Sequence, residues 1–179
     1  MIHNVLSVVA NELNNYLNLN FQFDEKKVLV SNLVNQDGTL AFEGSNKVVL
    51  TLLNIEEEGS LKSNMGIMKP GAKKELHVNM EVIFTSFFTG KNYIESLKIV
   101  SQVILFFNQK KVFTPNNTPD LYEKSNKLIF ELQSYSLQEL SHIWGMLGAK
   151  YMPSVIYKVS MLTFSNDIVF SDIPEIRSF

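Results

Sequence analysis

The chain of 179 residues contains no cysteine, which excludes disulfide bonds and metal sites built on thiolates. This absence fits synthesis in a reducing cytosol. Charged residues are also scarce, because they make up 19% of the chain and the formal net charge is only −2. Proteins that bind nucleic acid usually carry a basic face, and this composition does not supply one. We therefore expect no nucleic acid among the partners.

Long hydrophobic runs are missing as well. No stretch approaches the roughly 18 apolar residues that a membrane-spanning helix needs. The first 17 residues contain no lysine or arginine, and asparagines interrupt their apolar positions. A secretory signal instead has a basic start followed by an uninterrupted apolar segment. We expect synthesis in the cytoplasm without a signal peptide, and no membrane partner.

Motifs for catalysis or cofactor binding are equally scarce. The three histidines show no metal-ligand spacing, and neither a phosphate-binding loop nor a nucleophile elbow is present. Glu56–Glu58 follow one another at the end of a predicted strand, so their side chains point alternately and are solvated or contact a charged partner. The sequence therefore predicts neither an enzyme nor a cofactor.

Helical periodicity is present in three segments. Residues 2–18 carry one apolar stripe, and Tyr93–Phe107 is apolar almost all round, which is typical of a helix buried on several sides. A third helix is predicted to begin at Ser136, where Ser136 and Glu139 have the spacing of a capping box. Gly148 is expected to end it.

Strand patterns fill most of the remaining chain. Leu76–Phe88 shows the clearest alternation and would span about 40 Å, which is long for a strand. Exposed loops are predicted at Glu56–Lys74 and Phe113–Pro119. Strands that adjoin strands favour an α+β fold: a mainly antiparallel mixed sheet of about five strands, packed with an N-terminal helix and two further helices. The five predicted strands are Lys27–Val34, Lys47–Ile55, Leu76–Phe88, Leu128–Tyr135 and Val155–Phe164. Residues 1–164 would form this domain and residues 165–179 a C-terminal tail.

Several segments, taken in order, carry a family resemblance. The set resembles the N-terminal domain of the tail-terminator (cap) proteins of extracellular contractile injection systems, of the antifeeding-prophage and Photorhabdus-virulence-cassette type. The resemblance runs from residue 1 to about residue 164. The segments are Met1–Leu6, Asn32–Gly38, Asn46–Glu58, Val112–Pro119 and Leu140–Val155.

The resemblance implies a structural role without catalysis or cofactor. Members form a six-fold ring that caps the inner tube, stops its growth and ties the last sheath layer to it. The implied partners are other copies of the chain, the inner tube protein and the sheath protein. Some members carry a further C-terminal region that joins the sheath, whereas only Ser165–Phe179 follows the domain here.

Candidate contacts follow from this role. We expect the loop Glu56–Lys74 to sit on the tube end and the tail to add a strand to a sheath subunit. Neighbouring subunits are expected to meet at the long strand Leu76–Phe88 and the apolar helix Tyr93–Phe107. The candidate tube and sheath contacts are Lys69, Lys73, Lys74, Ile168, Val169 and Phe170, and the candidate ring contacts are Phe84, Phe87 and Phe106.

Two alternatives stay open at the level of sequence. The chain is a small ligand-binding protein or an enzyme with an unrecognised pocket, in which case titratable groups should converge on a deep polar cavity. Alternatively, it terminates a phage tail or an intracellular contractile device. A ring would do the same work in each setting, so the sequence does not distinguish a released particle from one that stays in the cell.

Overall fold

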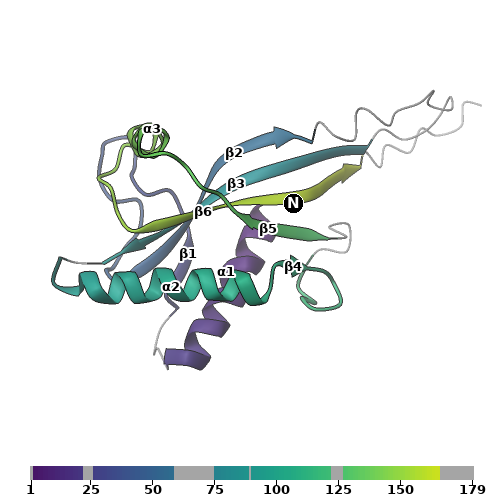
Figure 1. The fold of residues 1–179 in the computed structure, drawn as a ribbon, viewed down its shortest axis with the longest axis horizontal. Helices are drawn as coiled ribbons and strands as arrows, with labels where there is room; N and C mark the ends of the chain where they lie inside the picture. The colour runs from purple at the N-terminus through teal and green to yellow at the C-terminus, as the bar shows by residue number, and fades with distance from the viewer. Residues whose placement is uncertain (1, 22–25, 59–74, 89, 122–126, 166–179) are drawn as a thin grey trace, which may run out of the picture.

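The computed structural model describes residues 2–21, 26–58, 75–88, 90–121 and 127–165. They form an α+β fold around one mixed sheet, as expected, with six strands rather than about five (Figure 1). Only β1 and β2 pair in parallel, and every other neighbouring pair is antiparallel. The strand order across the sheet is β1 (Val28–Val30), β2 (Lys47–Glu57), β3 (Glu75–Phe87), β6 (Ser154–Ser165), β5 (Leu128–Leu132) and β4 (Val112–Phe113).

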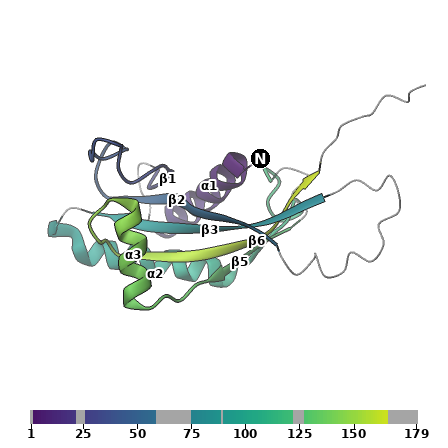
Figure 2. The same cartoon turned by 90° about the horizontal axis from the view of Figure 1, so that it is seen from above.

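A ladder of three long strands forms the centre of the sheet. β3 pairs with β2 from Phe87 to Val78, and with β6 from Thr85 to Glu75. The prediction of a long alternating strand is therefore confirmed, and this strand lies between two others. The far ends of β2, β3 and β6 project beyond the helices as an arm (Figures 1 and 2). Register shifts interrupt the ladder after Leu52 and after Val78, and such bulges increase the local twist.

One face of the sheet is covered by α1 (Ile2–Phe21) and α2 (Tyr93–Gln109) (Figure 1). Both helices bury an apolar stripe against the residues that alternate inward along the strands. At the centre, the Phe107 ring stacks on Phe130 at 4.5 Å and contacts Tyr157 at 4.6 Å between ring centroids. Other members of this core are Leu13, Leu17, Val82, Phe84, Phe106 and Phe113.

The opposite face is covered by α3 (Leu137–Leu147), with the segment 31–46 beside it. The predicted capping box is present: the Ser136 side chain accepts from the Glu139 backbone N–H, and the Glu139 carboxylate accepts from the Ser136 backbone N–H at 2.8 Å. Gly148 ends the helix with a φ of 65°, which glycine adopts without a Cβ clash. β2 is accordingly buried on both faces, with Val48 and Leu50 in one core and Val49 in the other.

Several predicted boundaries were wrong for physical reasons. β1 was expected over Lys27–Val34, but it pairs with β2 only over Val28–Val30. β5 was expected to reach Tyr135, but it ends at Leu132 and the chain then crosses to α3. Glu56 and Glu57 fall in the predicted loop Glu56–Lys74, but both belong to β2, because β3 supplies partners as far as Val78.

The strand β4 was missed altogether, since Phe113 was assigned to a loop. Val112 and Phe113 pair with Ile129 and Leu128. Two residues are too short to show a period, and their partners come from a distant part of the chain. Phe113 is fully buried, which explains why so short a strand is held in place.

Asn14 ties the N-terminal helix to the edge of the sheet. Its side chain is buried, and its amide nitrogen donates to the Val28 carbonyl at 2.8 Å. Its amide oxygen accepts from the backbone N–H groups of Lys27 and Val28 at 2.9 and 2.8 Å. A single side chain therefore satisfies both backbone groups of Val28, at the start of β1, and the N–H of Lys27 before it.

Replacing Asn14 with alanine should lower the free energy of unfolding by about 2–3 kcal/mol, because buried backbone groups of β1 lose their partners. Urea denaturation followed by circular dichroism measures the change. Asn15→Ala, at an exposed position on the same helix, is the matched control and should stay within about 0.5 kcal/mol of the parent. Equal stability of the two variants would show that Asn14 does not hold β1.

Candidate assembly surfaces

The outward face of α2 exposes a row of large apolar side chains. Tyr93, Ile94 and Leu97 lie in its first turns, and Ile94 is 64% exposed. Ile104 and Leu105 continue the row near the C-terminal end. The other face of α2 is buried in the core. The helix is therefore apolar almost all round, as predicted, because one apolar side packs inside the chain and the other is exposed on its surface.

A second exposed apolar surface lies on the opposite side of the sheet, around α3. Leu137 is 86% exposed, and Met146 and Tyr151 are exposed as well. Leu137, Leu140, Trp144 and Tyr151 line a hollow of about 360 Å³. The Trp144 ring contacts Tyr151 edge-on with centroids 5.5 Å apart. Within the described residues, the buried Trp144 indole N–H has no hydrogen-bond acceptor.

Polar groups gather at a third place, between α3 and the arm. The Tyr135 hydroxyl donates to the Glu81 carboxylate at 2.7 Å, and Glu139 and His142 line the same hollow of about 330 Å³. Hydrogen bonds from the Ser136 backbone and hydroxyl lower the pKa of Glu139. Burial, with help from Glu81, raises the pKa of Tyr135 to about 12. Glu81 and Glu139 are thus engaged in holding Tyr135 and capping α3.

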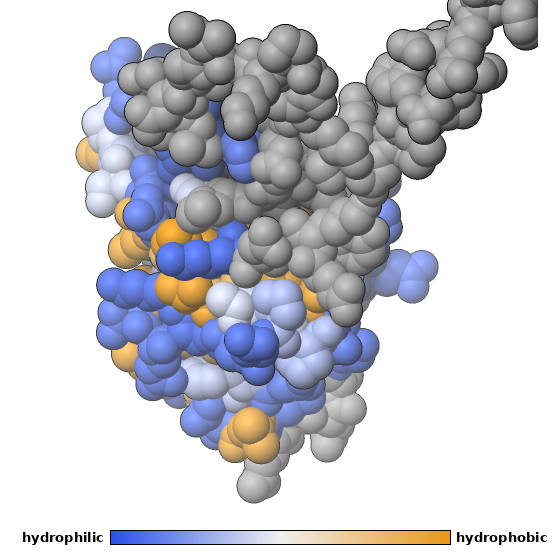
Figure 3. Space-filling view, turned by 90° about the vertical axis from the view of Figure 1, so that its right-hand side faces the viewer, coloured by the Kyte–Doolittle hydropathy of each residue, from blue (hydrophilic) through white to orange (hydrophobic). Residues whose placement is uncertain are grey.

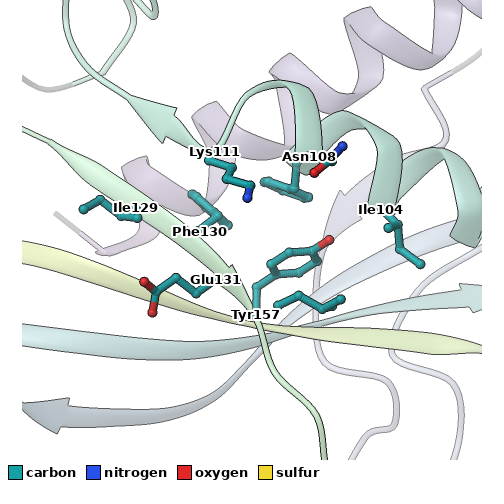
Figure 4. A pocket seen from close by; sticks show the side chains of 9 residues that line it. Ile104, Asn108, Lys111, Ile129, Phe130, Glu131 and Tyr157 are labelled. Atoms are coloured by element: carbon teal, nitrogen blue, oxygen red, sulfur yellow. The ribbon is translucent and has the colours of Figure 1, made fainter.

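A fourth hollow, of about 450 Å³, lies between the C-terminal end of α2 and β5 (Figure 4). Its walls are mainly apolar, with Phe107, Phe130 and Leu132 among them. Tyr157 stands on β6 at its base, and burial raises the pKa of this phenol to about 12. Among its described lining residues Glu131 is the one carboxylate, whereas acid–base catalysis by paired carboxylates needs two.

The end of the molecule from which the arm projects has a different character. The described side chains seen from that end are mainly hydrophilic, with small apolar patches between them (Figure 3). The exposed apolar side chains described above lie on α2 and around the hollow at α3.

Of the residues predicted to make contacts, six lie outside the described ranges and three lie within them. Lys69, Lys73, Lys74, Ile168, Val169 and Phe170 all lie outside the described residues. Phe84 and Phe106 are only 1% and 5% exposed, so their side chains belong to the core of the chain and are not accessible to a second copy. Phe87 is half-buried and packs edge-on against Phe42 at 5.1 Å.

Sequence reasoning missed the exposed residues around α3. Leu137 follows the N-cap directly and Tyr151 follows the C-cap, so both fall outside the periodic apolar stripe of the helix. A large apolar residue at such a position was a usable signal, since it has no place on the buried face. On α2, the apolar run from Tyr93 to Phe107 indicated an apolar helix, but it did not show which of its side chains are buried and which are exposed.

No described helix is long and apolar enough to cross a membrane. Nor do His, Asp and Glu side chains gather in threes anywhere in the described ranges in a way that would hold a metal ion.

Comparison with known proteins gives one family and a shared fold. The sequence profile described as the Pvc16 N-terminal domain matches residues 4–178. No curated protein matches the chain significantly. The cryo-EM structure of the PVC sheath/tube terminator in the extended state, from an extracellular contractile injection system, aligns with 100% of this chain and 65% of its own, at a TM-score of 0.60 and 16% identity.

A second solved structure has the same fold. The anti-feeding prophage cap (AFP tube terminating cap) aligns with 88% of this chain and 54% of its own, at a TM-score of 0.54 and 16% identity. The chain thus spans 65% and 54% of the lengths of the two structures.

The two phenols whose pKa is raised, the partly buried Tyr135 and the buried Tyr157, make stability sensitive to alkali. In the unfolded chain a tyrosine loses its proton near pH 10, whereas Tyr135 and Tyr157 keep theirs to about pH 12 when folded. The folded state then binds more protons, so stability falls as the pH rises from about 10 to 12. Urea denaturation across this range should show a shallower loss for the double variant Tyr135→Phe, Tyr157→Phe. Tyr93→Phe, on the exposed face of α2, is the control and should follow the parent; identical slopes for all three proteins would contradict the prediction.

Proposed function

Because the chain belongs to the Pvc16 N-terminal domain family, we propose that it is a structural cap protein that ends the inner tube of a contractile injection system. In this role it forms a six-fold ring, binds the last layer of the tube and anchors the last sheath layer. It works by assembly, without catalysis or a cofactor. We further propose that the particle is of the extracellular type, as is the one that contains the structurally similar sheath/tube terminator.

One observation carries this proposal. The whole chain aligns with a sheath/tube terminator at a TM-score of 0.60, and the family profile covers residues 4–178. The surface chemistry agrees with it, since the polar clusters of the described residues serve the fold and the large apolar side chains are exposed in two separate places. Such surfaces are typical of proteins that bind other proteins.

A closed ring needs two different surfaces on each subunit, because the contact is heterologous. The N-terminal half of α2, with Tyr93, Ile94 and Leu97, supplies one apolar surface. The surface around Leu137 and Tyr151 lies on the other side of the sheet and supplies a hollow. We place the subunit contact between these two, with the side chains of α2 of one copy seated at α3 of the next.

Ring formation should depend on the exposed side of α2. The double variant Ile94→Glu, Leu97→Glu places two charges in the proposed contact and should abolish the six-fold ring, because an unpaired charge is costly to bury. Native mass spectrometry of the purified chain and electron microscopy of capped tube ends both report the ring. Leu19→Glu, at a position 85% exposed on α1, is the matched control and should leave it intact. Six-fold rings from the double variant would remove α2 from the contact.

The tube and sheath contacts remain proposals about residues outside the described ranges. Lys69, Lys73 and Lys74 form the basic cluster of their loop and are proposed to bind an acidic tube end. The apolar residues Ile168–Phe170 are proposed to add a strand to a sheath subunit. The two contacts are separate in the sequence, so they are separable by mutation.

Two variants test these two contacts separately. The first replaces Lys69, Lys73 and Lys74 with glutamate, and the second lacks residues 167–179. The first variant should lose binding to purified tube ends, more so at low salt, because exposed charges are screened at high salt. The second should keep tube binding and the ring but retain less sheath on the particle. Tube co-sedimentation and sheath quantification by gel give the two readouts. Unchanged tube binding by the first variant, or unchanged sheath retention by the second, would refute the respective contact.

A further inference from the structure

The hollow between α2 and β5 is lined by one phenol, that of Tyr157. Tyr157 is only 3% exposed, and its ring packs on Phe107 at 4.6 Å between centroids. Its hydroxyl points away from β6 toward the side of Asn108 and Ile104 (Figure 4). None of the described residues makes a hydrogen bond with this hydroxyl. The hydroxyl is not among the fully buried polar atoms that lack a partner, so it is accessible from the hollow and can donate a hydrogen bond to an occupant.

Two further polar groups at this hollow, the Lys111 ammonium and the Asn108 amide, can donate hydrogen bonds. The Lys111 ammonium projects over it, while the Glu131 carboxylate points away from it (Figure 4). The neighbouring Lys110 is already engaged, since its ammonium pairs with Glu12 at 2.5 Å, but Lys111 has no ion pair with a described residue. The Asn108 amide stands on the same side. A lysine, an amide and a phenol together favour a carboxylate or carbonyl oxygen.

The sheet edge beside the hollow is open. The Phe130 backbone N–H donates outward to the Lys111 carbonyl at 2.9 Å, whereas the Gln133 N–H donates inward to the Ile156 carbonyl at 2.9 Å. Along an antiparallel strand, the backbone N–H and C=O groups of successive residues point to opposite sides. The backbone groups of Leu132 therefore point away from β6, as those of Phe130 do. β4 pairs only with Leu128 and Ile129, and no described strand covers Leu132. An extended peptide is the ligand that uses such an edge.

The hollow and the open edge of β5 beside it together form a groove. We propose that this groove binds an extended segment of a different protein of the particle. The segment places a large apolar side chain in the hollow and an adjacent carboxylate on Lys111. The apolar side chain contacts Ile104, Phe130 and Leu132, and an oxygen of the segment accepts from the Tyr157 hydroxyl. The volume of about 450 Å³ accommodates such a side chain. This inference rests on the proposed function, because the partner is taken from the other structural proteins of the particle.

The test uses intact particles in which the photoreactive residue p-benzoylphenylalanine replaces Leu132, a side chain 53% exposed at the rim of the groove. After illumination, mass spectrometry should find one adduct, with a single segment of another particle protein that carries an acidic residue next to a large apolar one. The same photoreactive residue at the exposed Leu19 on α1 is the control and should give at most a tenth of that adduct.

Two further variants test the chemistry of the groove. Adding Lys111→Glu should reduce the Leu132 adduct about tenfold, which corresponds to about 1.4 kcal/mol. Lys91→Glu, at the exposed start of the turn before α2, is the matched control and should leave it unchanged. Tyr157→Phe keeps the ring and removes only the hydroxyl, so it should reduce the adduct several-fold without loss of folding.

Three outcomes would overturn the inference: an adduct no stronger than at Leu19, an adduct unaffected by Lys111→Glu, or an adduct only with a second copy of the chain. The failure of the proposed function looks different. If the chain is absent from the particle ends by immunoelectron microscopy, the cap role fails. If the chain is present there and Leu132 gives no specific adduct, only the groove inference fails.

Discussion

The antiparallel pairing of β3 with β2 on one side and with β6 on the other is the interaction on which the rest of the structure depends. It joins residues separated by more than 70 positions, such as Val82 and Tyr157, in one ladder. The alternation of side chains along β3 then sends Val82 and Phe84 to one core and Ile83 to the other. Every helix is placed by the need to cover one of these two faces.

Covering both faces leaves the outer sides of the helices to the surroundings. α2 is apolar on its inner side, where Phe106 and Phe107 are buried, and also on its outer side, where Ile94 is exposed. A monomer gains nothing from exposing such residues, so their natural use is a contact between molecules. The α3 surface lies across the sheet, and two unlike surfaces on opposite sides of one subunit are what a closed ring requires.

The polar residues divide into those that the fold uses and those that it leaves available. Asn14 satisfies the backbone of β1, Tyr135 is held by Glu81, and Glu139 caps α3. The Tyr157 hydroxyl and the Lys111 ammonium, by contrast, have no partner among the described residues. We propose that these donors recognise another chain of the particle. The groove therefore gives the proposed assembly role a defined chemistry at one place.

Local signals in the sequence were sufficient for the main elements. The capping box at Ser136, the glycine stop at Gly148 and the alternation along Leu76–Phe88 all depend on residues close in the chain, and the structure confirms each of them. The resemblance in the ordered segments also led to the family that the profile match establishes. The α+β class followed from the order of these elements.

Pairing partners and exposure were beyond the reach of local patterns. β4 exists only because Leu128 and Ile129 lie beside it, and β1 pairs with β2 over only three residues although β2 itself is much longer. Phe84 and Phe106 looked suitable for ring contacts, but the packing of α2 on the sheet buries both. The groove at Tyr157 joins α2, β5 and β6. Local periodicity shows which residues share a face, but what lies against that face depends on contacts between segments far apart in the chain, and these form only when the chain folds.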